Sequence, residues 1–278
     1  MGNGSKLCYK TGSTAFKTGT ILMKNKKNNE LAVCGFAAVK TLEKINSQRI
    51  KRLYFTEEKA PLFAGLCKKL AKTKRPYNCV KDAKELEKLS GSVHHQGIVA
   101  MCEPPQVLPL TKQTAQSWAE NKEHVIILDR VGNANNLGAI VRSAAFFGIK
   151  NIVIPIDESQ SSITTSSYRV AEGGMEFVNI YSINSIPSLM DDMKGKMVSI
   201  GTALDAKYST RNLKELCKDK GALVILGNEE HGISDEIKKR CDYNVIIPFA
   251  NMGKQDCPCV DSLNVAQASS TILYELSK

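Results

Sequence analysis

Hydrophobic residues in the last part of the chain, beyond about residue 123, gather in short unbroken runs. Five runs rich in β-branched residues have the length of strands: His124–Leu128, Asn151–Ile156, Met197–Ile200, Ala222–Leu226 and Asn244–Pro248. Runs without polar alternation indicate strands buried on both faces, hence a mostly parallel sheet. Amphipathic stretches typical of helices lie between and after them: Leu137–Gly148, Ser185–Lys194, Leu213–Lys218, Glu236–Arg240 and Leu263–Leu276. The pattern predicts an α/β domain with helices on both sides of the sheet.

The first part of the chain predicts a second, smaller α/β unit. Expected helices cover Leu31–Leu42, Leu62–Thr73 and Ala83–Leu89, and expected strands cover Ile50–Phe55, Tyr77–Val80 and Gly97–Cys102. Pro104 and Pro105 then break the pattern. We therefore expect an arm over residues 1–31, a small α/β domain over 32–104, a linker over 105–122 ending in a short helix, and the larger domain over 123–278.

The net charge of +10 is distributed unevenly. Residues 1–105 carry all of the excess positive charge, while residues 106–278 are slightly acidic. A local excess of Lys and Arg is typical of a surface that binds phosphates, although it also suits a surface that only keeps the protein dissolved. On charge alone both interpretations stay open.

Nine cysteines are present and none forms a Cys-x-x-Cys pair. Cys257 and Cys259, with one residue between them, lack the spacing of a zinc site, and no second pair completes one. No apolar run approaches the roughly 20 residues that a membrane helix needs. We therefore expect reduced thiols in a cytoplasmic protein, with no metal and no membrane partner.

Three polar turns containing glycine or asparagine follow expected strands. The first is Leu128–Arg142, which contains the motif NNLGAIVR, and the second is Leu226–Ile233, which contains GNEEHG. The third begins with Ile247-Pro248 and closes with the motif SLNV at Ser262–Val265. None is a GxGxxG or GxxxxGK[ST] phosphate loop, which disfavours an ordinary dinucleotide enzyme or P-loop NTPase. Locally, Asn136 and Ser262 stand where they could cap the helices that follow, and Gly227 would allow a ligand close to the backbone.

In this order and spacing, the three motifs resemble those of the SpoU/TrmH branch of the SPOUT RNA methyltransferases, over residues 123–278. Val93–Ala100 (VHHQGIVA), with Cys34-Gly35-Phe36 upstream, is similar to the RNA-binding domain that many members carry in front. The resemblance implies transfer of a methyl group from S-adenosylmethionine to a ribose 2′-hydroxyl of tRNA or rRNA. It also implies a deep C-terminal trefoil knot and a homodimer with each active site near the subunit interface.

The resemblance also assigns roles to residues. Arg142 corresponds to the catalytic arginine at the ribose and its phosphate, Asn136 to the asparagine that orients it, and Glu229 to a glutamate of the second motif. Ser262 and Asn264 correspond to a pair near substrate and cofactor. The cofactor would be held by Thr202, Ala203, Leu226, Gly227, Asn228, Ile247, Ser262 and Leu263. Whether Arg142 or the RNA phosphate takes the proton stays open, because a guanidinium has a pKa above about 12.

Two alternatives remain: a SPOUT-like protein that binds RNA or assists ribosome assembly without turnover, and an α/β enzyme acting on a small metabolite. Singly, Asn136, Arg142 and Ser262 could each be structural. Two features depart from the family pattern. Residues 249–261 form a longer connection than usual beside the expected cofactor pocket. Glu172 stands in a turn where many members have small residues, and its charge could repel phosphate.

Overall fold

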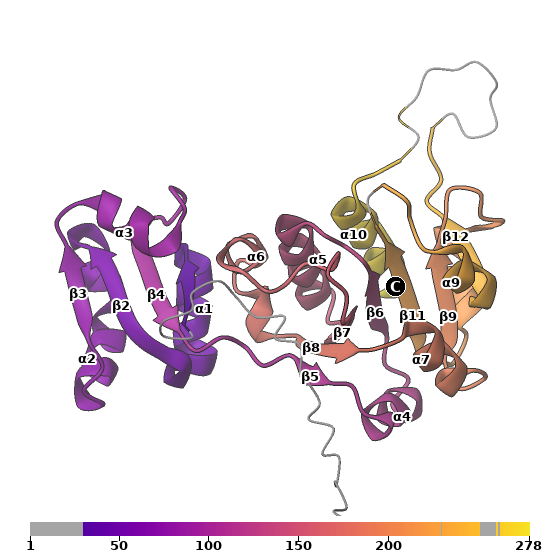
Figure 1. Ribbon diagram of the computed structural model, residues 1–278, viewed down its shortest axis with the longest axis horizontal. Helices are drawn as coiled ribbons and strands as arrows, with labels where there is room; N and C mark the ends of the chain where they lie inside the picture. Colours follow the sequence, from indigo (N-terminus) through magenta and orange to yellow (C-terminus); the bar gives the residue numbers. More distant parts are fainter. Residues whose placement is uncertain (1–29, 229, 251–259, 261) are drawn as a thin grey trace, which may run out of the picture.

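The computed structural model describes residues 30–228, 230–250, 260 and 262–278, and it contains two β-sheets (Figure 1). The expected arm, Glu229, Cys257 and Cys259 fall outside these residues, apart from the last two positions of the arm. Among the helices of the described ranges, none is long and apolar enough to cross a membrane.

The first sheet has four strands in the order β1-β4-β2-β3. Its strands are β1 (Leu31–Cys34), β2 (Ile50–Thr56), β3 (Tyr77–Val80) and β4 (Ile98–Cys102), and its helices are α1 (Phe36–Asn46), α2 (Ala64–Lys72) and α3 (Ala83–Ser90). Leu42 of α1 and Leu66 of α2 belong to the core on one face, whereas Leu86 of α3 belongs to the core on the other. Both faces are therefore covered, as expected of a small α/β unit.

The expected helix over Leu31–Leu42 is wrong at its beginning. Leu31–Cys34 forms β1, which pairs antiparallel with β4, and all four of its residues are buried. Gly35 follows with a φ of 96°, a left-handed conformation that ends the strand, and only then does α1 begin. A short apolar run does not reveal its partner strand, which comes from about 65 residues later in the chain.

The second sheet has eight strands in the order β10-β12-β9-β11-β6-β7-β8-β5, and every pairing in it is parallel. Its strands are β5 (Leu108–Pro109), β6 (Val125–Asp129), β7 (Asn151–Pro155), β8 (Asn179–Ile183), β9 (Val198–Thr202), β10 (Tyr208–Ser209), β11 (Ala222–Gly227) and β12 (Tyr243–Ile246). The five apolar runs fall on β6, β7, β9, β11 and β12, which confirms the mostly parallel sheet.

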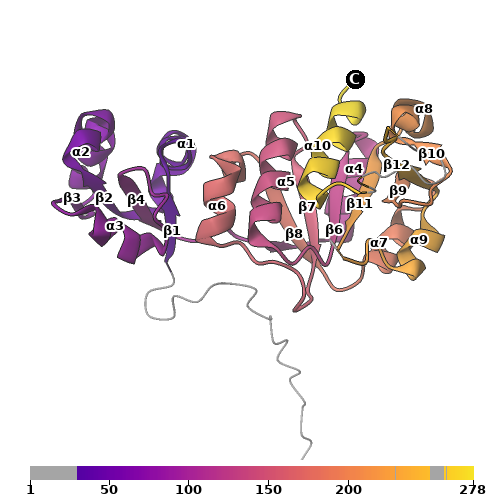
Figure 2. The same cartoon turned by 90° about the horizontal axis from the view of Figure 1, so that it is seen from above.

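Helices cover both faces of this sheet (Figure 2). Alternate residues of β6 divide between the two cores: Ile126 and Leu128 face one core, and Val125 and Ile127 face the other. The first core includes residues of α5 (Ala134–Phe146), α6 (Thr165–Ala171), α8 (Leu213–Cys217) and α10 (Val265–Leu276). The second includes residues of α4 (Lys112–Glu120), α7 (Ile186–Met193) and α9 (Asp235–Arg240). Neither α6 nor β8 was expected, since the segment over 157–183 is rich in Ser and Thr and lacks a long apolar run.

The segment expected to be a linker takes part in the second sheet. Leu108 and Pro109 form β5 and pair in parallel with Tyr181 and Ser182 of β8 at the edge of the sheet. The short helix expected there is α4, whose Trp118 is 2% exposed and contacts the ring of Tyr181 edge to face, with centroids 5.3 Å apart.

The two α/β units meet at a buried polar cluster made by Arg49 of the first unit and by Tyr168 and Glu176 of the second. The Glu176 side chain is 1% exposed and accepts hydrogen bonds from Arg49 Nη1 at 3.0 Å and from the Tyr168 hydroxyl at 3.0 Å. Arg49 Nη2 also donates to the Tyr168 hydroxyl at 3.0 Å. Burial would lower the pKa of Arg49, but Tyr168 and Glu176 raise it above its ordinary value, so the guanidinium stays charged. The apolar core around this cluster is continuous between the two units.

Glu176→Ala should lower the free energy of unfolding by about 3 kcal/mol, because it leaves the Arg49 guanidinium buried without its carboxylate. Urea denaturation measures this. Asp192→Ala is the control, since the Lys112–Asp192 pair spans 3.6 Å between exposed side chains and should contribute less than about 1 kcal/mol. Equal losses in the two variants would contradict the importance of the buried cluster.

Candidate functional site

A cavity of about 720 Å³ lies at the carboxyl ends of β9, β11 and β12. Thr202, Leu226 and Ile246 mark the three strand ends in its wall, and Leu263 and Ile272 close it from the segment before α10 and from α10 itself. Open α/β sheets bind ligands at this edge, and small-molecule sites usually enclose about 300–1,000 Å³. The cavity is thus the leading candidate for a cofactor site.

Among the described residues, the rim of the cavity is more acidic than basic. Asp205, Glu230 and Asp235 line it together with Lys238 and His231. Lys238 Nζ contacts the Asp205 carboxylate at 2.5 and 2.6 Å, and this hydrogen bond lowers the pKa of Asp205. Because Lys238 is engaged by Asp205, Glu230 and Asp235 leave a net negative charge that suits a cationic ligand.

A tight turn at the end of β11 forms one wall. Asn228 and Gly232 exchange backbone hydrogen bonds of 3.1 and 2.9 Å, and the Asn228 side-chain oxygen accepts from the backbone N–H groups of Glu230 and His231. A Cβ atom on Gly227 would lie 2.1 Å from the carbonyl carbon of Gly232. The turn can therefore close only over a glycine.

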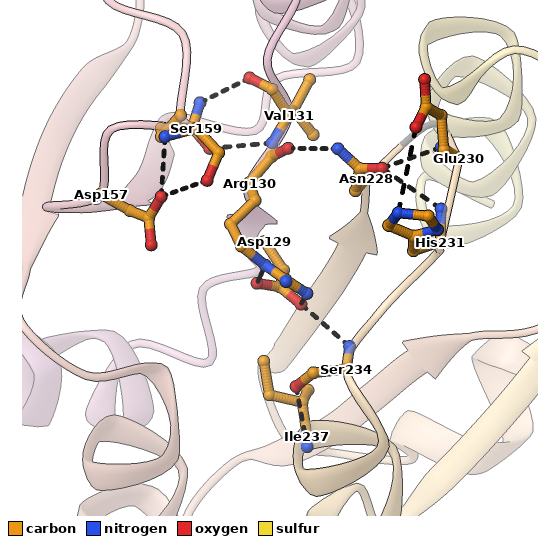
Figure 3. Close-up of polar contacts among 11 residues, drawn as sticks. Asp129, Arg130, Val131, Asp157, Ser159, Asn228, Glu230, His231, Ser234 and Ile237 are labelled. Atoms are coloured by element: carbon orange, nitrogen blue, oxygen red, sulfur yellow. Dashed lines mark hydrogen bonds and ion pairs between the residues drawn. The ribbon is translucent and has the colours of Figure 1, made fainter.

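A charged pair at the end of the neighbouring strand β6 supports this turn (Figure 3). Asp129 is 4% exposed and accepts from Arg130 Nε at 2.9 Å, from Arg130 Nη2 at 3.1 Å and from the backbone N–H of Ser234 at 3.0 Å. The hydrogen bond that Arg130 donates to the Asp129 carboxylate raises the pKa of Arg130. The Asn228 side-chain amide donates to the Arg130 carbonyl at 3.0 Å. These contacts fix the distance between the β6 and β11 turns.

The structure brings the expected cofactor residues together. Those that line the cavity are Thr202, Ala203, Leu226, Gly227, Asn228, Ile247, Ser262 and Leu263. They come from four chain segments that only the fold gathers at one edge.

The expected catalytic residues of the first motif lie elsewhere. Asn136 and Arg142 are on α5, and neither belongs to the described lining of the cavity. The expectation that Asn136 caps this helix is wrong: Asn133 is the cap, and its side chain accepts from the backbone N–H of Asn135 at 2.8 Å. Arg142 is 57% exposed and pairs with Glu172 across 2.9 Å.

The third motif also differs from the expected capping. Asn264, not Ser262, caps α10, accepting from the backbone N–H of Ala266 at 2.9 Å. Ser262 lies two residues earlier, in the cavity wall.

Four polar residues of this region were given no role from the sequence: Asp129 and Arg130, which belong to the first polar turn, and Asp205 and Lys238. A usable signal existed for the first two, because they directly follow the buried run that ends at Leu128, at the ligand-binding end of a parallel strand. Asp205 follows the expected cofactor residues Thr202 and Ala203. Nothing in the sequence pointed to Lys238, since its partner Asp205 is separated from it by a helix and two strands.

Two family models match the chain. Residues 123–274 match the SpoU rRNA Methylase family, and residues 32–108 match the model described as RNA 2′-O ribose methyltransferase substrate binding. A 23S rRNA (guanosine-2′-O-)-methyltransferase RlmB from Coxiella burnetii is 30% identical over 251 residues, covering 89% of this chain and 95% of that protein.

A tRNA/rRNA methyltransferase of Haemophilus influenzae is 31% identical over 185 residues, and that match spans 66% of this chain but only 51% of the relative. Among solved structures, the SpoU methyltransferase AviRb from Streptomyces viridochromogenes, in complex with AdoMet, superposes with a TM-score of 0.66. Its sequence identity is 20%, and the superposition covers 92% of this chain and 94% of AviRb. The two chains share a fold.

Gly227→Ala should open the turn at the end of β11, because the added Cβ meets backbone atoms that cannot move separately. We expect a loss of unfolding free energy of at least about 2 kcal/mol, measured by urea denaturation. Gly65→Ala is the control. Gly65 lies in α2, and its added Cβ would lie 3.9 Å from Glu43 Oε1, so the substitution should be neutral or stabilising. A fully stable Gly227→Ala protein would show that the turn tolerates a side chain.

Proposed function

Because the chain belongs to the SpoU rRNA methylase family, we propose that it transfers a methyl group from S-adenosylmethionine to a ribose 2′-hydroxyl of tRNA or rRNA. The observation that carries the proposal is the cavity at the ends of β9, β11 and β12, lined by the family-type motifs Gly227-Asn228 and Ser262-Leu263. The relatives named 2′-O-methyltransferases support the choice of the ribose as acceptor.

The cavity suits this cofactor in shape and charge. Leu226, Ile247 and Leu263 provide apolar surface for an adenine ring, and the closed Gly227 turn brings backbone groups to the wall. The acidic rim matches the positive charges of the sulfonium and the amino group. When bound, S-adenosylmethionine supplies an electrophilic methyl group, so this chain has to position the acceptor and handle one proton.

Arg142 is the residue that we assign to the acceptor side. Its guanidinium is planar, exposed and suited to bidentate contact with a phosphate next to the target ribose. A permanently charged guanidinium is a poor base, so we propose that the RNA phosphate takes the proton while Arg142 orients and stabilises it. Asn136, at the start of the same helix, would orient Arg142 or the ribose, and Glu229, Ser262 and Asn264 would lie near the substrate and the cofactor.

We further propose a homodimer with a deep C-terminal trefoil knot. Phe146 is 82% exposed at the end of α5, and Tyr274 of α10 is 52% exposed, with the ring of Phe147 between them. An aromatic surface of this kind suits burial against a second copy, which would bring Arg142 of one copy toward the cavity of the other. The mass of the protein in solution tests the dimer.

Residues 32–104 are proposed as the RNA-binding domain and residues 123–278 as the catalytic domain, acting in the cytoplasm. Lys68, Lys69 and Lys72 are exposed on α2, opposite the buried Leu66 and Leu70. Positive charges on one helix face can neutralise several phosphates without reading sequence. Contacts other than those of Lys68, Lys69 and Lys72 therefore have to select the target RNA.

The deciding experiment incubates the full-length protein with labelled S-adenosylmethionine and total RNA. The proposal expects label in RNA at one nucleotide whose 3′ linkage resists alkaline cleavage. Cofactor binding without transfer would instead favour an RNA-binding protein without turnover. Neither binding nor transfer would reject the assignment of the cavity.

Arg142→Ala should lower the transfer rate by about 100-fold or more, since it removes the donor expected at the developing charge. Cofactor affinity, measured by calorimetry, should stay within about twofold of the unmodified protein, because Arg142 is outside the described cavity wall. Arg211→Ala removes another exposed arginine and should change neither value. Undiminished turnover in Arg142→Ala would remove Arg142 from the mechanism.

Replacing Lys68, Lys69 and Lys72 together by Gln should weaken RNA binding and reduce the slope of log K against log salt by about 2. Cofactor affinity should not change. The matched control replaces three exposed lysines of the second unit, Lys112, Lys194 and Lys214. If the control lowers RNA affinity and the salt slope as much as the first variant does, the α2 surface is not the RNA-binding face.

A further inference from the structure

The guanidinium of Arg142, to which we assign the RNA phosphate, already forms an ion pair with the carboxylate of Glu172. Arg142 Nη2 lies 2.9 Å from Glu172 Oε2, and the two side chains are 57% and 48% exposed. A carboxylate and a phosphate present the same kind of oxygen acceptors to a guanidinium, so one can stand in for the other. The pair is therefore accessible to an incoming phosphate.

The backbone around Glu172 is held in an unusual conformation. Glu172 ends α6 with φ 46° and ψ 43°, a left-handed conformation that few residues other than glycine and asparagine adopt. The next residue, Gly173, has φ 94°, and a Cβ there would lie 2.4 Å from Thr41 Oγ1 of α1. A Cβ on Gly174 would lie 3.1 Å from the Cα of Arg142. The turn is thus packed between α1 on one side and α5 on the other.

Two residues after Gly174, the same segment is held between the two units by Glu176. Glu176, at the end of the 3-10 turn Gly174–Glu176, is buried against Arg49 and also accepts from Asn46 Nδ2 at 2.5 Å. The position of Glu172 is therefore set by contacts with the basic unit that we assign to RNA binding, and not by the free rotation of a surface loop.

We propose that Glu172 occupies the phosphate position on Arg142 in the absence of RNA, and that a phosphate of the bound RNA displaces it. Glu172 is a positioning residue in this scheme: it acts on the substrate only through Arg142. This inference rests on the role proposed above for Arg142. Exposed ion pairs contribute only about 0.2–1 kcal/mol, which is weak enough for a phosphate to exchange with the carboxylate.

In this exchange, the free energy needed to break the Arg142–Glu172 pair is subtracted from the binding free energy of any RNA that contacts Arg142. The apparent affinity falls by the fraction of molecules in which the guanidinium is available. RNA that does not bring a phosphate to Arg142 gains nothing by opening the pair. Glu172 therefore lowers the affinity only of RNA that places a phosphate on Arg142, and it leaves the affinity of RNA that only contacts the basic surface unchanged.

A double-mutant cycle tests the exchange with a short fluorescent RNA hairpin that the unmodified protein methylates, or, if none is methylated, one that it binds. Glu172→Gln keeps the size of the side chain and removes its charge. It should tighten binding about two- to fivefold, the range that an exposed ion pair permits. In an Arg142→Gln background, the same substitution should change affinity by less than about 1.5-fold, because there is no guanidinium left to release.

Two further variants complete the design. Glu120→Gln removes one exposed charge from α4, on the opposite side of the sheet from α5, and should leave RNA affinity unchanged. Glu172→Asp keeps the charge but shortens the side chain by one methylene, so it should also tighten binding. It replaces Glu172→Gln in the cycle if that variant fails to fold. In the transfer reaction, Glu172→Gln should lower KM for the hairpin and leave kcat within about twofold.

Equal tightening in both backgrounds would overturn the proposal, since Glu172 would then act by repelling RNA at a distance. An unchanged affinity in Glu172→Gln would overturn it as well. The cycle measures binding alone, so it does not depend on turnover. If the unmodified protein binds the hairpin and the cofactor but methylates no RNA, the proposed function fails while the exchange at Arg142 is still measured.

Discussion

The parallel arrangement of the eight-stranded sheet is the constraint on which the rest of the molecule depends. Parallel strands place all of their carboxyl ends at one edge, and the helices that return the chain cover both faces. Turns that are far apart in the sequence, after β9, β11 and β12, therefore enclose one cavity. The Asp129–Arg130 pair, at the end of β6, holds the neighbouring turn in place from the same edge (Figure 3).

The junction between the two units is the second organising feature. The segment from Glu172 to Glu176 follows α6 and packs at once against α1 and α5. Its buried end is fixed by Arg49, and its exposed end reaches Arg142. The five residues from Glu172 to Glu176 thus connect the contact with Arg49 of the basic unit to Arg142, the arginine assigned to the acceptor. The cofactor cavity lies apart from this junction, so the two halves of the proposed reaction are built by different parts of the fold.

The sequence by itself determined the class of the fold and, through its resemblance to a known family, indicated the residues of the cavity. Unbroken β-branched runs such as Val125–Leu128 and Ala222–Leu226 can be buried on both faces only in a covered parallel sheet. Polar turns after such strands meet at one edge, and it was the resemblance of their motifs to the SpoU/TrmH methyltransferases that named residues from Thr202 to Leu263 as neighbours in advance. These signals are local: hydrophobic periodicity and the residue types of a turn are carried by a few consecutive positions.

The tertiary structure alone decided features that depend on a distant partner. Leu31–Cys34 is a strand because β4 lies beside it, and the short segment at Leu108 is a strand because β8 does. Asn133 and Asn264, rather than Asn136 and Ser262, cap their helices because packing of α5 and α10 sets where each helix begins. The pairing of Arg142 with Glu172 belongs to the same class. Thirty residues separate the two charges in the chain, and only the packing of α5 beside the turn after α6 brings them within hydrogen-bonding distance.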